Sequence, residues 1–228
     1  MPDYLIFQLT AALGAMGEFA GHERRGSLIW PGRAALIGLM GAALGVRRGG
    51  DFSALDALQT AVAVFDHGGP LRDYHTVETV PTAAARRPQS RPEALRLANG
   101  RTNTTITLRD YRTGPLYGVA VWGGPLLELQ AALKQPVFTL YLGRKSCPLA
   151  APLDPLVTDA ASPEAALAHL RLPPWQRGKV ARIMATDDRP DASRRETRHD
   201  IVNDRLLWHF SEREVAVVPV EIAPEVAK

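Results

Sequence analysis

A short basic segment, Gly143-Arg144-Lys145-Ser146-Cys147-Pro148, combines two cations, a hydroxyl group and the only thiol of the chain, directly after an apolar stretch. Successive backbone amides after a glycine, beside arginine and lysine side chains, can form a concave site for the phosphates of a nucleic acid. The segment lacks the spacing of a nucleotide-binding phosphate loop and leads to a proline rather than into a helix, which argues against an NTPase. The alternative is a solvated turn after a strand.

A second cation, Arg33, lies at the predicted start of a helix that runs from Pro31 to Gly45. Free amides and the helix dipole favour an anion at such a position, so the pattern predicts a phosphate contact there. The alternative is a surface arginine on a glycine- and alanine-rich helix that packs closely against its neighbours.

The segment Arg72-Asp73-Tyr74-His75 carries a histidine beside a tyrosine. With Lys145, these side chains could supply the general base, the orienting group and the charge stabilisation of a metal-independent ribonuclease. The same tyrosine and histidine could also stack on bases or pack in the fold.

Metal or cofactor chemistry is not predicted. The six histidines form no H-E-x-x-H motif or i, i+4 pair. The acids Asp187, Asp188 and Asp191 are interleaved with arginines and indicate a neutralised loop rather than a cation site.

Charge is distributed unevenly along the 228 residues, whose net charge is only +3. The stretch from Pro81 to Thr105 holds five arginines, Arg101 among them, against one glutamate. A single cysteine excludes an intrachain disulfide, as expected in the cytoplasm. The longest apolar run, 34–46, is too short to cross a membrane.

The predicted elements follow the order strand, helix, strand, insertion, strand, helix, strand, and are Tyr4–Leu9, Pro31–Gly45, Ala61–Phe65, an irregular insertion from Asp66 to about Thr107, Leu116–Trp122, Pro125–Lys134 and Val137–Leu142. This order predicts an α+β, ferredoxin-like (RRM-like) split βαβ domain. We expect this domain over 1–153, with an inserted hairpin, or thumb, at about 67–108. A small β-rich C-terminal extension, packed on the same domain, is expected over 154–228, with a helix starting near Ser162 and strands near Val180–Ala185 and Glu214–Val220.

Taken together, these motifs resemble those of the CasD family, the backbone-capping subunits of type I-E CRISPR Cascade. The resemblance runs from about Tyr4 to Leu153 and includes Thr107-Leu108-Arg109-Asp110-Tyr111, which looks like the Arg-acid-Tyr stretch of that family. It implies a non-catalytic subunit that binds the 5′ handle of the CRISPR RNA, caps the filament of repeated backbone subunits, contacts the large PAM-reading subunit and meets target DNA through the complex.

The predicted RNA-binding residues are those of the cationic motifs together with the two that the resemblance adds, namely Arg33, Arg72, Tyr74, His75, Arg101, Arg109, Tyr111, Gly143, Arg144, Lys145, Ser146 and Cys147. In type I-C systems the equivalent subunit resembles this one but cleaves precursor RNA, so a metal-independent endoribonuclease is the alternative function. A third possibility is a stand-alone RNA-binding module.

Overall fold

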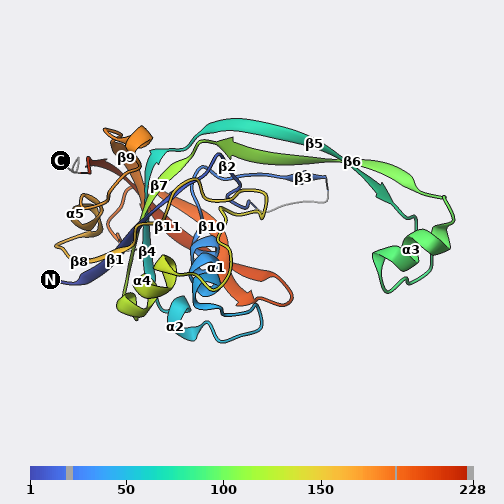
Figure 1. The fold of residues 1–228 in the computed structure, drawn as a ribbon, viewed down its shortest axis with the longest axis horizontal. Helices are drawn as coiled ribbons and strands as arrows, with labels where there is room; N and C mark the ends of the chain where they lie inside the picture. Colours follow the sequence, from blue (N-terminus) through green and yellow to red (C-terminus); the bar gives the residue numbers. More distant parts are fainter. Residues whose placement is uncertain (19–22, 188, 225–228) are drawn as a thin grey trace.

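A seven-stranded antiparallel sheet, in the order β10-β11-β9-β4-β7-β1-β8, runs through the body of the molecule (Figure 1). The structure, a computed structural model, describes residues 1–18, 23–187 and 189–224. The strands of this sheet are β1 (Asp3–Thr10), β4 (Gln59–Asp66), β7 (Leu116–Trp122), β8 (Leu156–Asp159), β9 (Ala181–Thr186), β10 (Arg195–Asp204) and β11 (His209–Ile222).

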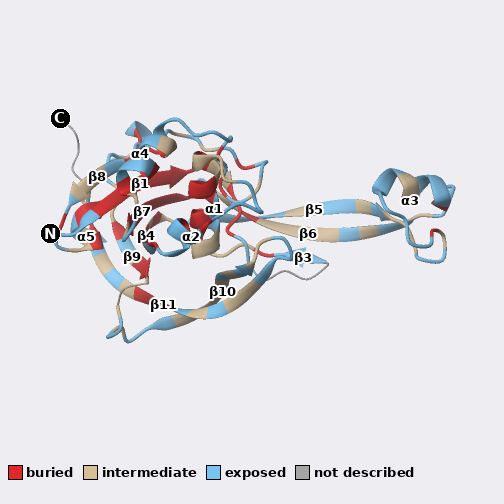
Figure 2. Ribbon diagram, turned by 90° about the horizontal axis from the view of Figure 1, so that it is seen from below, coloured by how far each residue is buried: buried red, intermediate tan, exposed pale blue. Residues whose placement is uncertain are grey.

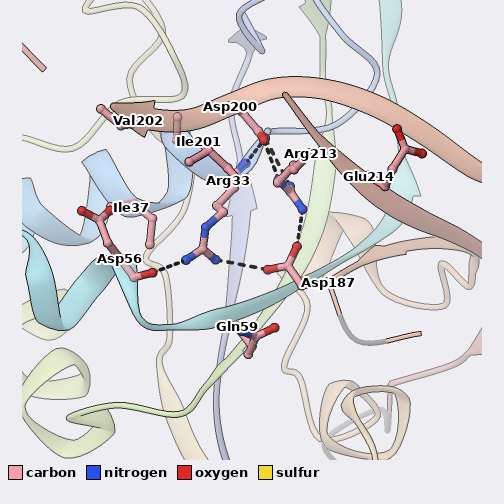
Figure 3. A pocket seen from close by; sticks show the side chains of 11 residues that line it. Arg33, Ile37, Asp56, Gln59, Asp187, Asp200, Ile201, Val202, Arg213 and Glu214 are labelled. Carbon is pink, nitrogen blue, oxygen red and sulfur yellow. Dashed lines mark hydrogen bonds and ion pairs between the residues drawn. The ribbon is translucent and has the colours of Figure 1, made fainter. Parts of the chain in front are cut away.

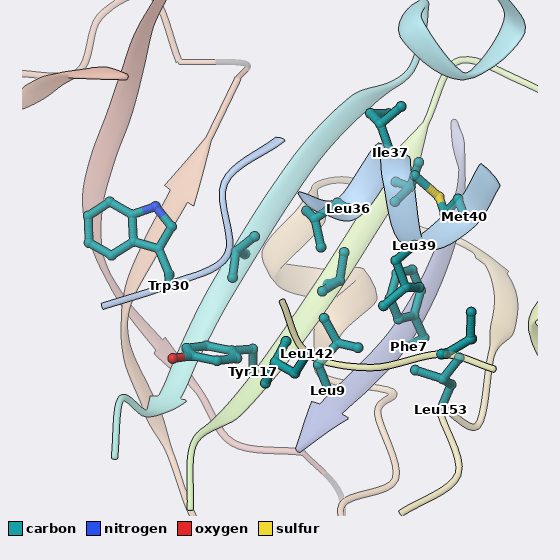
Figure 4. Close-up of a cluster of buried hydrophobic side chains, with 14 of the residues drawn as sticks. Phe7, Leu9, Trp30, Leu36, Ile37, Leu39, Met40, Tyr117, Leu142 and Leu153 are labelled. Carbon is teal, nitrogen blue, oxygen red and sulfur yellow. The ribbon is translucent and has the colours of Figure 1, made fainter. Parts of the chain in front are cut away.

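Helices cover both faces of the central strands, which explains why β1 is buried almost throughout rather than at alternate residues. On one face, α1 (Arg33–Leu44) and α4 (Leu126–Lys134) pack with odd-numbered β1 residues such as Phe7 and Leu9 (Figure 4). On the other face, α5 (Pro163–Leu167) packs with Ile6. The short elements α2 (Ser53–Asp56) and η1 (Pro174–Gln176) lie in connections. No helix of the described residues is long and apolar enough to span a membrane.

Most predicted elements of the core are confirmed, with ends within a few residues of the prediction. The helix α1 ends as expected at Gly45, whose φ of 79° is left-handed and whose amide donates to the carbonyl of Ala42 at 3.2 Å. Leu126, Leu129 and Leu133 of α4 are buried as predicted. Ser162 caps α5 by accepting a hydrogen bond from the amide of Ala165.

The predicted strand Val137–Leu142 is wrong. The amides of Val137 and Phe138 instead donate to the carbonyls of Ala43 and Ala42 at the end of α1, at 2.9 and 3.2 Å. These bonds satisfy carbonyls that the last turn of a helix leaves free, so the apolar segment closes a helix end rather than joining the sheet. The strand at the edge of the sheet beside β1 is β8, which comes from the segment expected to form the C-terminal extension.

The insertion is a hairpin, as expected, but its strands are regular, although the loss of periodicity had indicated an irregular segment. It is a long hairpin of β5 (Gly69–Thr79) and β6 (Asn103–Thr113), paired over eleven positions, that extends away from the body (Figures 1 and 2). Its far end carries α3 (Arg91–Ala98), which Ser90 caps by accepting from the amide of Glu93. Two short strands, β2 (Leu13–Gly14) and β3 (Arg24–Arg25), pair with β6 near the body.

Candidate nucleic-acid interface

Several of the predicted cationic residues meet where the hairpin joins the body. We call this place the hairpin root, made of β2, β3, residues 108–113 of β6 and the loop 143–147. The strand β3 runs parallel to β6, with Arg24 opposite Leu108 and Arg25 opposite Arg109. The loop reaches this sheet through Arg144, whose Nη2 donates to the carbonyl of Arg25 at 3.2 Å.

The loop itself is shaped by Gly143, which has a left-handed φ of 89°. A Cβ atom at this position would overlap the carbonyl oxygen of Ala15, so only glycine fits. Beyond it, the amide of Cys147 donates to the carbonyl of Arg144, and the amide of Leu142 to the carbonyl of Cys147, each at 2.8 Å. The turn thereby presents residues 144–146 on its outer side.

Two expectations about this loop need correction. The thiol of Cys147 is fully buried in the core and does not reach the surface, so it is not an RNA contact. The amides of Gly143 and Cys147 already donate within the loop, to Tyr141 and Arg144, and are not available to an anion. The amides of residues 144–146 remain the donors that a concave anion site in this loop would use. Lys145 and Ser146 are exposed.

Arg144 and Arg109 each carry a side-chain nitrogen atom that has no acceptor within residues 1–18, 23–187 and 189–224. The Arg144 guanidinium lies over the ring of Tyr111, 4.5 Å from its centroid, and its Nη1 is buried without a partner among the described residues. The Nε atom of Arg109 is also buried without a partner among the described residues. Arg109 and Tyr111 are two residues apart on β6 and therefore share a face. A buried guanidinium nitrogen without an acceptor is costly, so this face of the root is suited to an anionic ligand.

The opposite face of the hairpin root is internally neutralised. Asp110 accepts hydrogen bonds from Arg24 at 2.8 Å and from Arg72 at 2.7 Å. The bond from Arg72 is the main influence that lowers the pKa of this carboxyl group to about 2, and Arg24 adds to it. Arg72, predicted as an RNA contact, thus already has an anionic partner. The sequence analysis included Asp110 in a motif but assigned it no role.

Tyr74 and His75 lie further along the hairpin, opposite Leu108 and Thr107 respectively. Tyr74 is 71% exposed, and His75 is also exposed. As neighbours on one strand they point to opposite faces. The two side chains therefore do not converge on one phosphate, as a general base and its orienting group would.

Arg101 and Arg33 lie apart from the hairpin root. Arg101 is at the far end of the hairpin, where its Nε donates to the carbonyl of Ala98 at 3.3 Å. Arg33 lies at the start of α1, where its amide donates to the carboxylate of Asp200 at 2.6 Å. The anion expected at this helix start is thus supplied by the protein itself.

The carboxylates around Arg33 form a partly buried ionic network that sequence reasoning missed (Figure 3). Asp187 accepts from Arg33 at 3.1 Å and pairs with Arg213, and Arg213 also donates to Asp200 at 2.5 Å. Asp187 is therefore neutralised, but by residues distant in sequence rather than by the neighbouring arginines; Asp188 lies outside the described residues. The network borders a hollow of about 350 Å³ between α1, β10 and β11.

Comparison with known proteins places the chain in a family. Residues 4–216 match the family described as CRISPR-associated protein (Cas_Cas5). The Cascade subunit CasD of Escherichia coli K12 is 34% identical over 184 residues, which cover 73% of this chain and 76% of CasD.

Solved structures show the same fold. A chain of a CRISPR RNA-guided surveillance complex superimposes with a TM-score of 0.71 and 25% identity, covering 96% of this chain and 90% of that one. A crystal structure of a Cas protein gives a TM-score of 0.61 at 23% identity, with 98% of both chains covered. The chain belongs to the CRISPR-associated Cas5 family.

Proposed function

We propose that this chain is a non-catalytic subunit of a CRISPR RNA-guided surveillance complex, that it binds the 5′ handle of the CRISPR RNA, and that the hairpin root is the binding site. The observation that carries the proposal is a pair of buried nitrogen atoms, one each from Arg109 and Arg144, on one face of the root, which have no hydrogen-bond partner in the part of the chain that the structure describes. Phosphate oxygens accept such N–H groups and tolerate a fixed guanidinium geometry. Lys145 and Ser146 lie on the same loop and would extend the contact to a neighbouring phosphate or sugar.

The fold supports this proposal through the way it presents the root. Strands β8-β1-β7-β4, with α1 and α4 on one face, have the order and directions of a ferredoxin-like split βαβ core. Within this core the hairpin is inserted between β4 and β7, so the root lies at the end of two buried central strands. A rigid base of this kind holds binding side chains more precisely than a free loop does.

The hairpin is the thumb of this subunit in our proposal. It carries the basic stretch from Pro81 to Thr105 well away from the body (Figure 2). Arg101 at the far end, and the exposed Tyr74 beside the hairpin root, would contact RNA or the neighbouring backbone subunit. The proposal also includes capping of the backbone filament, contact with the large PAM-reading subunit and access to target DNA through the complex, which the resemblance of the sequence motifs implies; 34% identity to a Cascade subunit supports membership of such a complex.

An endoribonuclease is the alternative, and the geometry of the hairpin disfavours it. Tyr74 and His75 point to opposite faces, and Lys145 lies on the loop at the root. General acid–base catalysis requires the participating groups to lie within hydrogen-bonding reach of one reacting site. The proposal therefore assigns these residues to binding.

Purification of the assembled complex tests the proposal. The tagged chain is expressed with the other subunits encoded beside it and with a CRISPR array, and the copurifying small RNAs are sequenced. We expect RNAs that begin with the repeat-derived 5′ handle, and a lower RNA yield for the Arg109→Gln, Arg144→Gln double variant. Purification of a complete complex without such RNA would contradict the proposal. Specific cleavage of repeat RNA by the chain alone, abolished by His75→Ala, would favour the endoribonuclease.

A further inference from the structure

The tip of the hairpin formed by β10 and β11 exposes three consecutive large apolar side chains. Leu206, Leu207 and Trp208 are 68, 64 and 59% exposed. Residues at such a tip are ordinarily small or polar, and a contiguous exposed apolar group of this kind marks an interaction site. We propose that this apolar tip docks into an acidic-rimmed apolar pocket on another protein subunit of the same complex, an inference that rests on the proposed function.

The apolar tip is held in a defined conformation. Asp204 Oδ1 accepts from the amides of both Leu206 and Leu207 at 2.8 Å, and Trp208 has a left-handed φ of 57°. Arg205 anchors the turn to the body, because it pairs with both carboxylate oxygens of Asp56 at 2.6 and 3.0 Å. Its guanidinium also lies 3.8 Å from the ring centroid of Phe52. A surface that is ordered before binding loses less conformational entropy when a partner arrives.

The strands behind the tip are fixed as well. Asp200 of β10 and Arg213 of β11 belong to the partly buried ionic network, which ties both strands to the start of α1 and to Asp187 (Figure 3). Removing one partner of such a network is destabilising, because it leaves a poorly solvated charge unpaired. The hairpin of β10 and β11 is therefore held in a fixed position on the body, and the apolar tip projects from it.

The chemistry of the tip favours a protein over a nucleic acid. Two of the three exposed side chains are leucines, which fill apolar pockets but offer no ring for a base to stack on. The third, Trp208, already has one ring face covered by the guanidinium of Arg48, 4.2 Å from the ring centroid. Tryptophan and arginine are the residues that most often dominate protein–protein binding energy.

The positive charge at the edge of the apolar tip predicts the sign of the charge on the partner's surface. Arg47 and Arg48 are exposed and form no ion pair with a carboxylate among the described residues, whereas Arg205 is neutralised by Asp56. Charges of opposite sign meet across specific interfaces, so the partner pocket carries acidic residues at its rim. A nucleic acid and a second copy of this chain are the competing occupants, and the test below separates them.

The test uses the complex assembled with the other subunits and CRISPR RNA, analysed by native mass spectrometry. The tip variant is Leu206→Ser, Leu207→Ser, Trp208→Ser, and the charge variant is Arg47→Glu, Arg48→Glu. Trp175→Ser is the matched control, because Trp175 is 63% exposed on η1. We expect complexes assembled with the tip variant or the charge variant to contain at least tenfold less of one particular protein subunit, while they retain the RNA. The control complex should keep every subunit. Thermal melting followed by circular dichroism establishes whether each variant is folded. If the tip variant is unfolded, the result for the charge variant decides the test.

Three results would overturn the inference. One is full subunit composition in the folded tip and charge variants. Another is loss of handle RNA binding by the isolated tip variant, which would make the tip a nucleic-acid contact. The third is concentration-dependent self-association of the wild-type chain that the tip variant abolishes. Failure of the proposed function is distinguished from these, since it appears as absence of handle RNA from the wild-type complex.

Discussion

At the scale of residues, the arginines of the hairpin root differ in how far the protein itself satisfies them. Arg72 is bound by Asp110, whereas Arg109 and Arg144 each keep a buried nitrogen without an acceptor among the described residues. The sequence indicated all three as cations near an anion. It could not distinguish them, because the pairing depends on which strand faces point together.

Asp110 gives the root a measurable pH dependence. Its pKa is about 2 in the folded chain against 3.8 for an ordinary aspartate. A lowered pKa stabilises the fold above the unfolded value, and this contribution is lost as the pH falls from about 4 to about 2. We expect Asp110→Asn to lower the free energy of unfolding by about 1 kcal/mol at pH 7, measured by urea denaturation. An undiminished difference between wild type and variant near pH 2 would contradict this role.

Gly143 is the second residue-scale test. Gly143→Ala would place a methyl group against the carbonyl of Ala15 and force alanine into a left-handed conformation. We expect a loss of about 2–4 kcal/mol in unfolding free energy. Gly178→Ala is the matched control, because Gly178 has a φ of 79° but no neighbour within 4 Å of a Cβ atom. The control substitution should lower the unfolding free energy by only about 1 kcal/mol, the cost of holding alanine in a left-handed backbone conformation. Equal losses in the two variants would show that the contact with Ala15 does not matter.

At the scale of elements, the sequence predicted the buried strands and helices and the position of the inserted hairpin, but not the regular strands of that hairpin. The strands β1, β4 and β7 can be predicted from apolar runs in the sequence, because both of their faces are covered. The strands β5 and β6 have little buried surface, so no apolar alternation marks them. The segment Val137–Leu142 has the opposite problem: it is apolar because Leu140 and Leu142 are buried, although its backbone forms no strand.

The far end of the hairpin should be the first part of the free chain to be cleaved by a protease. Residues 86–90 are exposed and lie outside helix and strand, directly before the start of α3. We expect trypsin to cut first after Arg86, since Arg87 and Arg91 precede prolines. Assembly with RNA and backbone subunits should protect this bond, as followed by mass spectrometry of the fragments. Resistance equal to that of the body in the free chain would contradict the expectation.

At the scale of the whole molecule, long-range ion pairs join regions that the sequence analysis treated separately. Arg33 bonds to Asp187 and Asp200, which lie 154 and 167 positions away along the chain. No local sequence pattern predicts such long-range interactions, so the sequence indicated only an isolated helix start and a charged loop. The seven-stranded sheet that results supports both the hairpin root and the apolar tip on one body.

The most direct test of the central claim is the affinity of the purified chain for RNA that carries the 5′ handle, titrated over a series of salt concentrations. The Arg144→Ala, Lys145→Ala variant is compared with Arg177→Ala, Arg182→Ala, which removes the same charge from exposed positions outside the root. We expect the root variant to bind about 10- to 100-fold more weakly, with the salt slope reduced by about one unit for each lost phosphate contact. The control should bind nearly as wild type. Wild-type affinity of the root variant at physiological salt would contradict the assignment of the hairpin root as the RNA site.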